Sequence, residues 1–267
     1  MWKTGFTISK MLKLFLKVNK LEAHSFGLFF NHSNTLALQS FQHKKHLFFD
    51  LDHTLWDFDK NSGFAFDTIF KQQGFDIELS DFLNIYIPRN QHYWKLYQVN
   101  KISHDDLRYY RLKDVFDALQ FEVSDEMIHH LSDEYIKYLP EYNHLFDGAI
   151  ELLDYLKPKY QLHIITNGFA SVQTKKMKNS NIVHYFETIT NSEMAGVKKP
   201  HRNIFDFALS LANATKEESL MIGDSYEADI IGAQEAGIEA IFFNEQNLQL
   251  ENPVFQIKHL LELKNIL

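Results

Sequence analysis

Two acidic residues stand directly after a short apolar run. The run, His46–Phe49, is too short and too uniform for an amphipathic helix and is typical of a buried strand. Asp50 and Asp52 follow it, and in an extended chain their side chains lie on the same side. Two carboxylates so placed repel each other unless a cation or different chemical roles separate them. The pair therefore predicts a polar site, with a divalent cation as one solution.

Polar residues follow two further predicted strands. Thr166 and Asn167 come after Leu162–Ile165, and Asp224 comes after Leu220–Ile222. Ligands of open α/β sheets bind outside the carboxyl ends of the strands, which is where the two aspartates are expected. As an isolated dipeptide, the threonine and asparagine would be more typical of a turn or a helix cap. A functional site is favoured only because the other candidate residues are present in the same chain.

One lysine and one further aspartate complete the set. Lys199 directly precedes Pro200, which suits the first position of a helix. Lys198 is the alternative, and both lysines could instead form a solvated surface pair. Asp229 lies in the first turn of a predicted helix, where the helix dipole alone would favour an acid. Both assignments therefore depend on where the side chains lie.

Strands and helices alternate along most of the chain, which predicts parallel βαβ units. A fourth strand is expected at Ala240–Phe243, and helices at Gly148–Leu156, Ala170–Lys178, Arg202–Leu211 and Glu227–Ala236. Only helical patterns lie between the first two strands, at Phe64–Gln73, Asp81–Gln98, Ser103–Leu119 and Ser124–Tyr138. That stretch is too long for a plain connection. The sequence thus predicts an α/β fold, a doubly wound, Rossmann-like parallel sheet at 44–62 and 146–267 with an all-helical insert at 63–145.

Composition and missing motifs exclude several functions. The 267-residue chain has no cysteine, which excludes a disulfide scaffold, a cysteine nucleophile and a thiolate zinc site, and fits a reducing compartment. It has neither GxxxxGK[ST] nor GxGxxG, so the usual glycine-rich phosphate-binding loops are missing. The 14 histidines show no paired metal-ligand spacing. A formal net charge of −8 disfavours a nucleic-acid partner.

The beginning of the chain differs from the rest in charge. The first 49 residues contain seven lysines and a single acid, Glu22. Lysines recur at helical spacing from Lys10 to Lys20 with apolar residues between them, which predicts a short basic amphipathic helix. We interpret residues 1–43 as a dispensable extension or the product of a mis-chosen start codon, with a surface-binding helix as the rival. No stretch approaches the ~20 apolar residues of a membrane span, so no stable membrane association is expected.

Together the candidate residues resemble the signature of the haloacid dehalogenase-like superfamily of phosphohydrolases. That family has a DxDxT sequence at the end of its first strand, matched here by Asp50-Leu51-Asp52-His53-Thr54. The other motifs follow in the same order: Thr166-Asn167-Gly168, Lys199-Pro200, and Gly223-Asp224-Ser225 with Asp229. The resemblance covers about residues 44–244, and the helical insert matches the family's cap domain.

The resemblance implies a catalytic role for each matching residue. Asp50 would be the nucleophile that forms an aspartyl phosphate, and Asp52 the general acid and base. The Thr166 side chain and the Asn167 backbone would donate hydrogen bonds to the phosphoryl oxygens of the substrate. Lys199 would supply positive charge where negative charge concentrates.

The resemblance also implies Mg²⁺ as the cofactor, since this ion prefers oxygen ligands and leaves room for water and phosphate. Its expected ligands are Asp50, the Asp52 carbonyl and Asp224. Asp229 belongs to the same metal-binding set as a supporting residue. Thr54, on the substrate side, would hold the geometry of the loop.

The second aspartate implies a class of substrate. Members of the superfamily that cleave carbon–halogen bonds lack it, so Asp52 implies a phosphate ester and a small phosphorylated metabolite as partner. The stretches Asp50–Asn61, Gly196–Pro200 and Gly223–Ile230 look like the pyrimidine 5′-nucleotidase branch, which is bacterial and cytoplasmic. A nucleoside monophosphate is then the expected substrate. The alternatives are a phosphatase or phosphomutase for small sugar phosphates or phosphoglycolate, and a non-catalytic binding protein of the same fold.

The insert carries residues able to stack a base, although each aromatic could equally pack one helix on another. They are Tyr93, Trp94, Tyr97, Tyr109 and Tyr110, with Arg89, Arg108 and Arg111.

Overall fold

The computed structural model describes Phe41 and residues 43–267 of the chain. Residues 44–265 form one compact unit. The basic helix expected from Lys10 to Lys20 lies outside the described residues, and it stays a prediction. In the described part of the chain, no helix is both long enough and apolar enough to cross a lipid bilayer.

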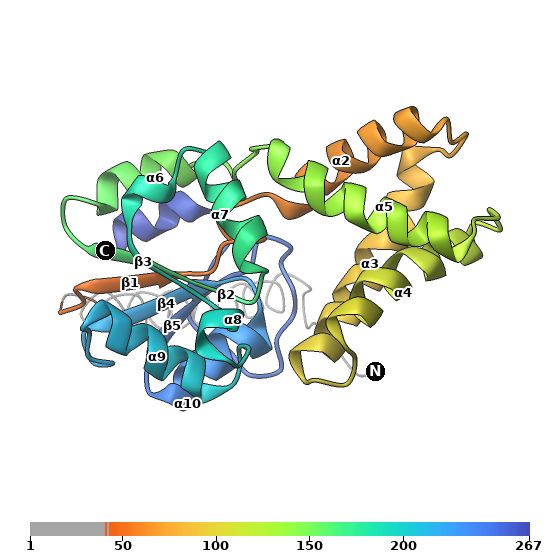
Figure 1. Cartoon of the computed structure of the whole chain (residues 1–267). Coiled ribbons are helices and arrows are strands. Elements are labelled where there is room, and N and C mark those ends of the chain that lie inside the picture. Colours follow the sequence, from red (N-terminus) through yellow and green to blue (C-terminus); the bar gives the residue numbers. More distant parts are fainter. Residues whose placement is uncertain (1–40, 42) are drawn as a thin grey trace, which may run out of the picture. The chain divides into compact units, whose positions relative to one another are not determined.

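The centre of the unit is a six-stranded parallel sheet with the strand order β3-β2-β1-β4-β5-β6 (Figure 1). The strands are β1 (His46–Phe49), β2 (Gln161–Thr166), β3 (Phe186–Asn191), β4 (Ser219–Gly223), β5 (Glu239–Phe243) and β6 (Gln256–Ile257). Phe49 of β1 is in register with Ile164 of β2 and Ile222 of β4. The residues that follow in these three strands therefore reach the same edge of the sheet. There Asp50 donates its backbone N–H to the Ile222 carbonyl at 2.9 Å.

Helices cover both faces of this sheet (Figure 1). The helices α6 (Ala149–Leu156) and α7 (Ala170–Asn179) lie on one face, and α9 (Arg202–Ala212) and α10 (Gly232–Ala236) on the other. The second pair packs on the sheet through buried apolar residues that include Phe48, Phe205 and Met221. The predicted α/β class, with its doubly wound, Rossmann-like parallel sheet, is confirmed.

Short helical turns complete the connections between these elements. They are Val183–Tyr185, α8 (Ser192–Ala195), Tyr226–Ile231 and Leu260–Asn265. The turn at Tyr226–Ile231 is π-helical and runs directly into α10, so the helix expected at Glu227–Ala236 is present with a wider first half.

The sequence pattern misses two strands, β3 and β6. Both are edge strands, whereas the four predicted strands are the inner four of the sheet. An edge strand has a neighbour on one side only, so fewer of its side chains need to be apolar. Accordingly β3 mixes buried with part-exposed residues and β6 has two residues, one of them exposed. Neither contains the uniform apolar run by which a buried strand is detected.

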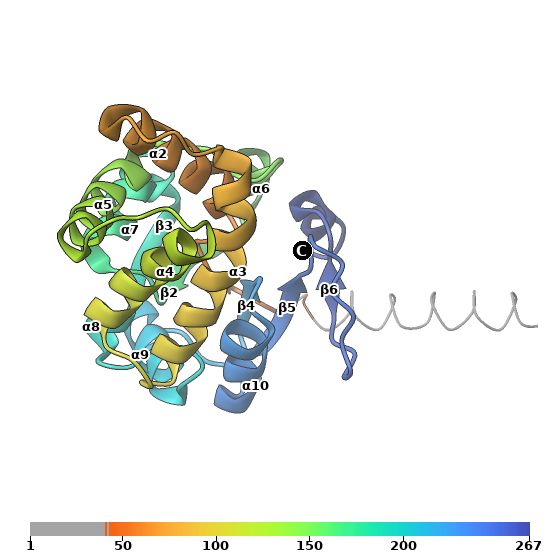
Figure 2. The same ribbon diagram turned by 90° about the vertical axis from the view of Figure 1, so that its right-hand side faces the viewer.

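Four helices make up the insert between β1 and α6; they gather on one side of the sheet domain, at the right in Figure 1 and in front in Figure 2. They are α2 (Phe58–Gln73), α3 (Leu79–Gln98), α4 (His104–Ala118) and α5 (Asp125–Tyr138), followed by a short turn at Leu139–Glu141. The first begins before the expected Phe64 because the Asp57 carboxylate accepts a hydrogen bond from the Lys60 N–H at 3.2 Å and caps the helix.

Aromatic rings fill the interior of the insert. Phe66 contacts Phe82, Tyr86 and Tyr135 at ring-centroid distances of 4.7, 4.6 and 4.6 Å. Buried Arg111 lies over the Tyr135 ring, with its guanidinium carbon 5.0 Å from the centroid. This arginine therefore packs the insert.

Candidate active site

A tight turn after β1 orients the first motif. The Leu51 carbonyl accepts hydrogen bonds from the N–H groups of Leu55 and Trp56 at 3.0 and 2.8 Å. His53 adopts the left-handed backbone conformation, with φ 62°, and fully buried Trp56 anchors the end of the turn. The polar side chains of the motif thus project from one hydrogen-bonded turn toward different neighbours.

Lys199 stands at the centre of the site. Its side chain is 2% exposed, and its Nζ atom lies 2.5 Å from Asp50 Oδ1 and 2.6 Å from Asp229 Oδ1. It also donates to the Ile165 carbonyl at 2.7 Å. Burial alone would lower the pKa of Lys199, but the two carboxylates outweigh it and raise the pKa above its ordinary value. Lys199 therefore stays protonated beside Asp50. The Lys198 side chain points elsewhere, and its Nζ donates to Asn100 Oδ1 at 2.6 Å.

Three closely spaced carboxylates lie beside this lysine, and two of them contact it. Oxygen atoms of Asp50, Asp224 and Asp229 all lie within 4.8 Å of one another. Burial raises the pKa of Asp50 well above its usual value, although the Lys199 cation opposes the shift. Burial and the Asp229 charge raise the pKa of Asp224 to about 8. Three carboxylates carry more negative charge than one lysine neutralises. Their hard oxygen donors fit a Mg²⁺ ion, whose positive charge would compensate the excess.

Two of these carboxylates are held by neighbouring groups. The hydroxyl of fully buried Thr54 donates to Asp224 Oδ1 at 3.0 Å. Asp229 Oδ2 accepts the Ser225 backbone N–H at 3.0 Å, while Oδ1 contacts Lys199. Since both oxygens of Asp229 have partners within the protein, Asp50 and Asp224 are better placed to receive a cation. The supporting role expected for Asp229 stays a prediction.

The second motif connects β2 to the site. The Asn167 side chain pairs with the Lys199 backbone in both directions, donating to its carbonyl at 2.9 Å and accepting its N–H at 2.7 Å. Thr166 Oγ1 accepts hydrogen bonds from the Gly168 N–H at 3.1 Å and from Gln173 Nε2 at 2.7 Å. Because a hydroxyl has two lone pairs and one proton, its proton remains to donate. Thr166 is thereby oriented as a donor, and the expected phosphate contact of Asn167 rests on its backbone.

The Asp52 side chain belongs to a separate set of contacts. Asp52 Oδ1 pairs with Lys176 Nζ at 2.6 Å, and Oδ2 accepts a hydrogen bond from Gln173 Nε2 at 2.9 Å. Both partners lie on α7, and neither was predicted as a site residue. One signal for them was present in the sequence: Lys176 and Gln173 fall on the same helical face as Val172 and Met177, where apolar residues are expected. The helix α7 begins beside a motif. A lysine on its buried face is therefore a candidate to pair with a carboxylate of the site.

Comparison with known proteins agrees with this geometry. A family model described as haloacid dehalogenase-like hydrolase matches residues 47–243. The chain belongs to the haloacid dehalogenase-like hydrolase family. The resemblance expected from the sequence motifs is therefore confirmed, and the helical insert corresponds to the cap of this family.

Relatives of the haloacid dehalogenase-like chain include two named nucleotidases. The pyrimidine 5′-nucleotidase PynA of Streptococcus pneumoniae is 34% identical over 207 residues, which are 77% of this chain and 86% of that protein. The pyrimidine 5′-nucleotidase YjjG of Escherichia coli is 30% identical over 225 residues, which are 83% of this chain and 96% of that one. Together with the family model, these relatives show that the chain is a phosphohydrolase of the haloacid dehalogenase-like family.

A solved structure supports the same fold. The HAD-hydrolase YfnB from Bacillus subtilis, crystallised with magnesium, matches with a TM-score of 0.75 at 29% identity over 84% of this chain and 98% of that one. An L-2-haloacid dehalogenase from Xanthobacter autotrophicus matches with a TM-score of 0.65 at 15% identity over 83% and 97%. The second comparison shows that the fold is shared.

Part-exposed aromatic residues of the cap contact the core beside the second motif. Phe169, two residues after Asn167, lies against Trp94, Tyr97 and His104 at ring-centroid distances of 5.6, 6.2 and 4.4 Å. We call Trp94, Tyr97, His104 and Phe169 the aromatic cluster. It is the part of the cap's aromatic set that meets a loop of the site.

Other candidates from the cap have partners within the cap. Tyr93 donates to Asp114 at 2.6 Å, Tyr109 donates to Asp125 at 2.6 Å, and Arg108 pairs with Asp133. The structure thus separates residues that hold the cap together from those that face the core.

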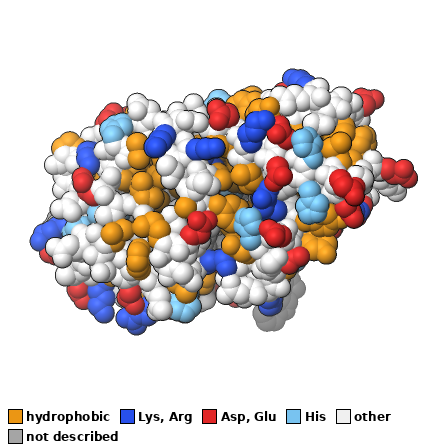
Figure 3. Space-filling model, viewed as in Figure 1, with side chains coloured by type: hydrophobic (Ala, Val, Ile, Leu, Met, Phe, Trp, Pro, Cys, Tyr) orange, Lys and Arg blue, Asp and Glu red, His pale blue; other side chains and the backbone are white. Residues whose placement is uncertain are grey.

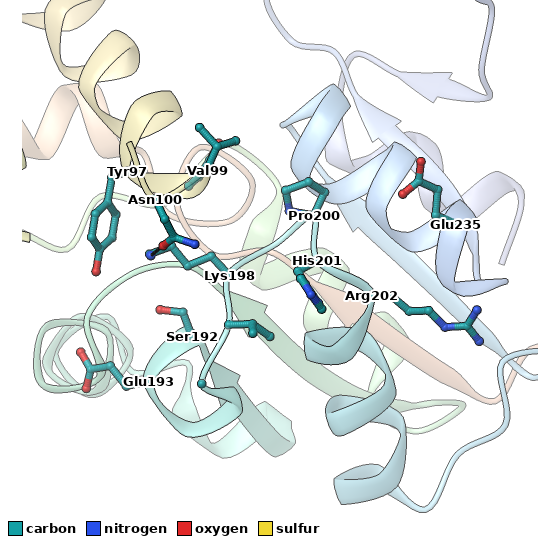
Figure 4. Close-up of a pocket in the computed structure, with 13 residues that line it drawn as sticks. Tyr97, Val99, Asn100, Ser192, Glu193, Lys198, Pro200, His201, Arg202 and Glu235 are labelled. Carbon is teal, nitrogen blue, oxygen red and sulfur yellow. Dashed lines mark hydrogen bonds between the residues drawn. The ribbon is translucent and has the colours of Figure 1, made fainter. Parts of the chain in front are cut away.

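A cavity of about 670 Å³ opens beside the aromatic cluster (Figure 4). Tyr97 and Asn100 line it from the end of α3 and the loop that follows. Lys198 lines it from the segment before α9, and Arg202 from the first position of that helix. Lys198 Nζ lies 4.0 Å from the centroid of the Tyr97 ring. The cavity combines one aromatic face with polar and charged groups. Acidic, basic and hydrophobic side chains are also mixed over the face of the molecule shown in Figure 3.

Proposed function

We propose that this chain is a Mg²⁺-dependent phosphomonoesterase that acts through an aspartyl phosphate on Asp50, with nucleoside monophosphates, pyrimidines first, as substrates. The observation that carries the chemistry is buried Lys199, 2.5 Å from Asp50 Oδ1 and 2.6 Å from Asp229 Oδ1. A carboxylate nucleophile that must approach an anionic phosphate needs a fixed cation beside it. Lys199 supplies that charge without reorganisation, because three acceptors already hold its ammonium group.

In the first step the Asp50 oxygen that does not contact Lys199 attacks phosphorus. A bond forms between this oxygen and phosphorus while the bond from phosphorus to the ester oxygen breaks. For this step Asp52 must carry a proton; it gives that proton to the departing oxygen, which leaves as an alcohol, and so becomes the carboxylate that Lys176 and Gln173 hold in the structure. Lys199 and the Thr166 hydroxyl stabilise the negative charge on the phosphoryl oxygens.

In the second step Asp52, now a carboxylate, takes a proton from a water molecule. The water oxygen bonds to phosphorus as the bond to Asp50 breaks, so inorganic phosphate leaves and both aspartates return to their starting states. One residue thus serves as acid and then as base.

The metal part of the proposal rests on the donor set. Asp50 and Asp224, with the Asp52 carbonyl, would hold Mg²⁺, and Thr54 and Lys199 keep the two carboxylates in place. When bound, the ion would neutralise charge on the phosphate and help to orient it. The crystal of the relative YfnB with magnesium supports the choice of ion.

The nucleotide part rests on two supports. Two relatives of similar length carry the name pyrimidine 5′-nucleotidase. The aromatic cluster also places flat side chains from cap and core beside the phosphate-binding loop, where the leaving group of a substrate would extend. Stacking on an aromatic side chain contributes about 1–3 kcal/mol per base.

A substrate panel tests the proposal. We expect kcat/KM for phosphate release, with Mg²⁺ at neutral pH, to be higher for UMP and dTMP than for ribose 5-phosphate, hexose phosphates or phosphoglycolate. A lead of about tenfold for a sugar phosphate or phosphoglycolate, about 1.4 kcal/mol in transition-state binding, would contradict the nucleotide assignment and leave the phosphatase assignment standing.

A cap variant tests the aromatic cluster. Trp94→Ala should lower kcat/KM for UMP about tenfold, because a stacking surface is lost, with little change for ribose 5-phosphate. Tyr93→Ala is the matched control, since its hydroxyl bonds Asp114 within the cap. Equal losses in the two variants would contradict the assignment of the cluster to the base.

A further inference from the structure

The Asp52 carboxylate is held by α7 on both of its oxygens. Lys176 Nζ lies 2.6 Å from Oδ1, and Gln173 Nε2 lies 2.9 Å from Oδ2. The two partners are three residues apart on the helix, so they project from the same side of it. Neither belongs to a sequence motif of the family signature described above.

Lys176 is buried where it makes this contact. Its side chain is 2% exposed, and its Nζ lies 4.2 Å from the Trp56 ring centroid and 5.0 Å from that of Phe58. An ammonium group buried against aromatic rings is costly unless a carboxylate compensates it, and Asp52 does so here. Its neighbours Lys175 and Lys178 are exposed.

Gln173 joins the acid to the phosphate-binding threonine. Its Nε2 group donates both to Asp52 Oδ2 at 2.9 Å and to Thr166 Oγ1 at 2.7 Å. A Cβ atom on Gly168 would lie 2.4 Å from Nε2, so the glycine makes room for this side chain. The position of Asp52 is thereby tied to the residue that would donate to the phosphoryl group.

We infer that Lys176 and Gln173 are positioning residues, which set the Asp52 carboxyl group at a fixed place relative to Thr166 and so to the ester oxygen of the substrate. The inference rests on the proposed function, since it assigns these residues to its acid step. Without Lys176, Asp52 loses its ionic partner and is free to rotate away from the leaving group. Proton delivery then suffers, while nucleophilic attack by Asp50 does not.

The leaving group separates this role from a structural one. p-Nitrophenolate departs as a stable anion and needs little protonation, whereas phenolate depends more on a general acid. Phenyl phosphate and p-nitrophenyl phosphate are otherwise nearly alike in shape. The ratio kcat/KM covers the steps up to loss of the leaving group, so it excludes the later attack of water on the intermediate. A misplaced Asp52 lowers it selectively for phenyl phosphate.

The experiment compares Lys176→Met with the exposed control Lys175→Met, each with Mg²⁺. For Lys176→Met we expect kcat/KM for phenyl phosphate to fall about 10- to 100-fold, and for p-nitrophenyl phosphate less than about threefold. Lys175→Met should match wild type on both substrates. Gln173→Leu, which keeps the side-chain volume but removes the amide, should show the same selectivity and decides the matter if Lys176→Met does not fold by circular dichroism.

Equal losses on the two aryl phosphates, or wild-type values for both substrates, would overturn the inference while leaving the proposed function intact. If the wild-type protein hydrolyses neither substrate nor any nucleotide, the proposed function itself fails, and the assignment of Lys176 fails with it. The two failures are thus distinguishable in one set of measurements.

Discussion

Adding a single methyl group at the end of β4 should disrupt the lysine–carboxylate arrangement. A Cβ atom on Gly223 would lie 2.3 Å from Asp229 Oδ2 and 2.4 Å from its Cγ, whereas ordinary contacts begin at 3.4 Å. In Gly223→Ala the Asp229 carboxylate must therefore move by about 1 Å.

That shift changes two contacts of Asp229. In the wild-type structure Oδ2 lies 3.0 Å from the Ser225 backbone nitrogen and Oδ1 lies 2.6 Å from Lys199 Nζ. Both distances lengthen in the variant. Lys199 then loses one of its two carboxylate partners and no longer stands in its place beside Asp50. A displacement of about 1 Å in a catalytic group typically costs about 100-fold in rate. The strain itself should cost about 1–3 kcal/mol in the free energy of unfolding.

The assay is kcat/KM for p-nitrophenyl phosphate at saturating Mg²⁺, with urea unfolding of the same sample. Gly63→Ala is the matched control, because its Cβ would meet only the end of the flexible Leu83 side chain in the cap, at 3.3 Å. We expect the control to keep its rate. A folded Gly223→Ala protein with the wild-type rate would refute the idea that Asp229 must stay where it is to hold Lys199.

Three further outcomes are expected. Asp50→Asn should abolish phosphate release and keep the fold, because it removes the nucleophile while changing little in volume; retained wild-type turnover would contradict the covalent mechanism. Treatment with EDTA should remove activity, and added Mg²⁺ should restore it; activity that survives thorough chelation would contradict the metal assignment. Acid should destabilise the protein through His163, whose Nε2 lies 3.1 Å from His46 Nδ1 and whose Nδ1 lies 2.9 Å from Thr188 Oγ1. Burial, with a smaller effect of His46, lowers the pKa of His163 from 6.5 to about 4, so the unfolded chain binds more protons between these pH values and the free energy of unfolding falls below pH 6.5. The fall should reach at most about 3 kcal/mol by pH 4 in urea titrations, and His163→Asn should reduce it; an unchanged pH dependence in that variant would count against His163 as the source.

The inner strands and the polar residues after them could be predicted from the sequence because both depend on local pattern. A strand buried on both faces must be apolar throughout, so β1, β2, β4 and β5 are visible as short uniform runs. Parallel strands end at a common edge, and the residues that follow them must therefore gather there. That argument explains why Asp50 and Asp224, which the family motifs single out in the sequence, come together in the structure.

The remaining features depend on which segments meet, and no local pattern contains that information. Lys175, Lys176 and Lys178 look alike in sequence, yet only Lys176 turns inward, because α7 packs with that face toward the turn after β1. Its partner Asp52 is 124 residues away along the chain.

The cap shows the same limit. Trp94 and Tyr93 are adjacent aromatics with equal claims in the sequence, but helical geometry points them in different directions. Trp94 contacts Phe169 of the core, while Tyr93 bonds Asp114 within the cap. The sequence by itself determined the fold class and the position of the polar edge, since buried strands demand apolar runs. Only the tertiary structure decided which lysine holds the second aspartate and which rings reach the site, because those contacts arise from the packing of distant helices.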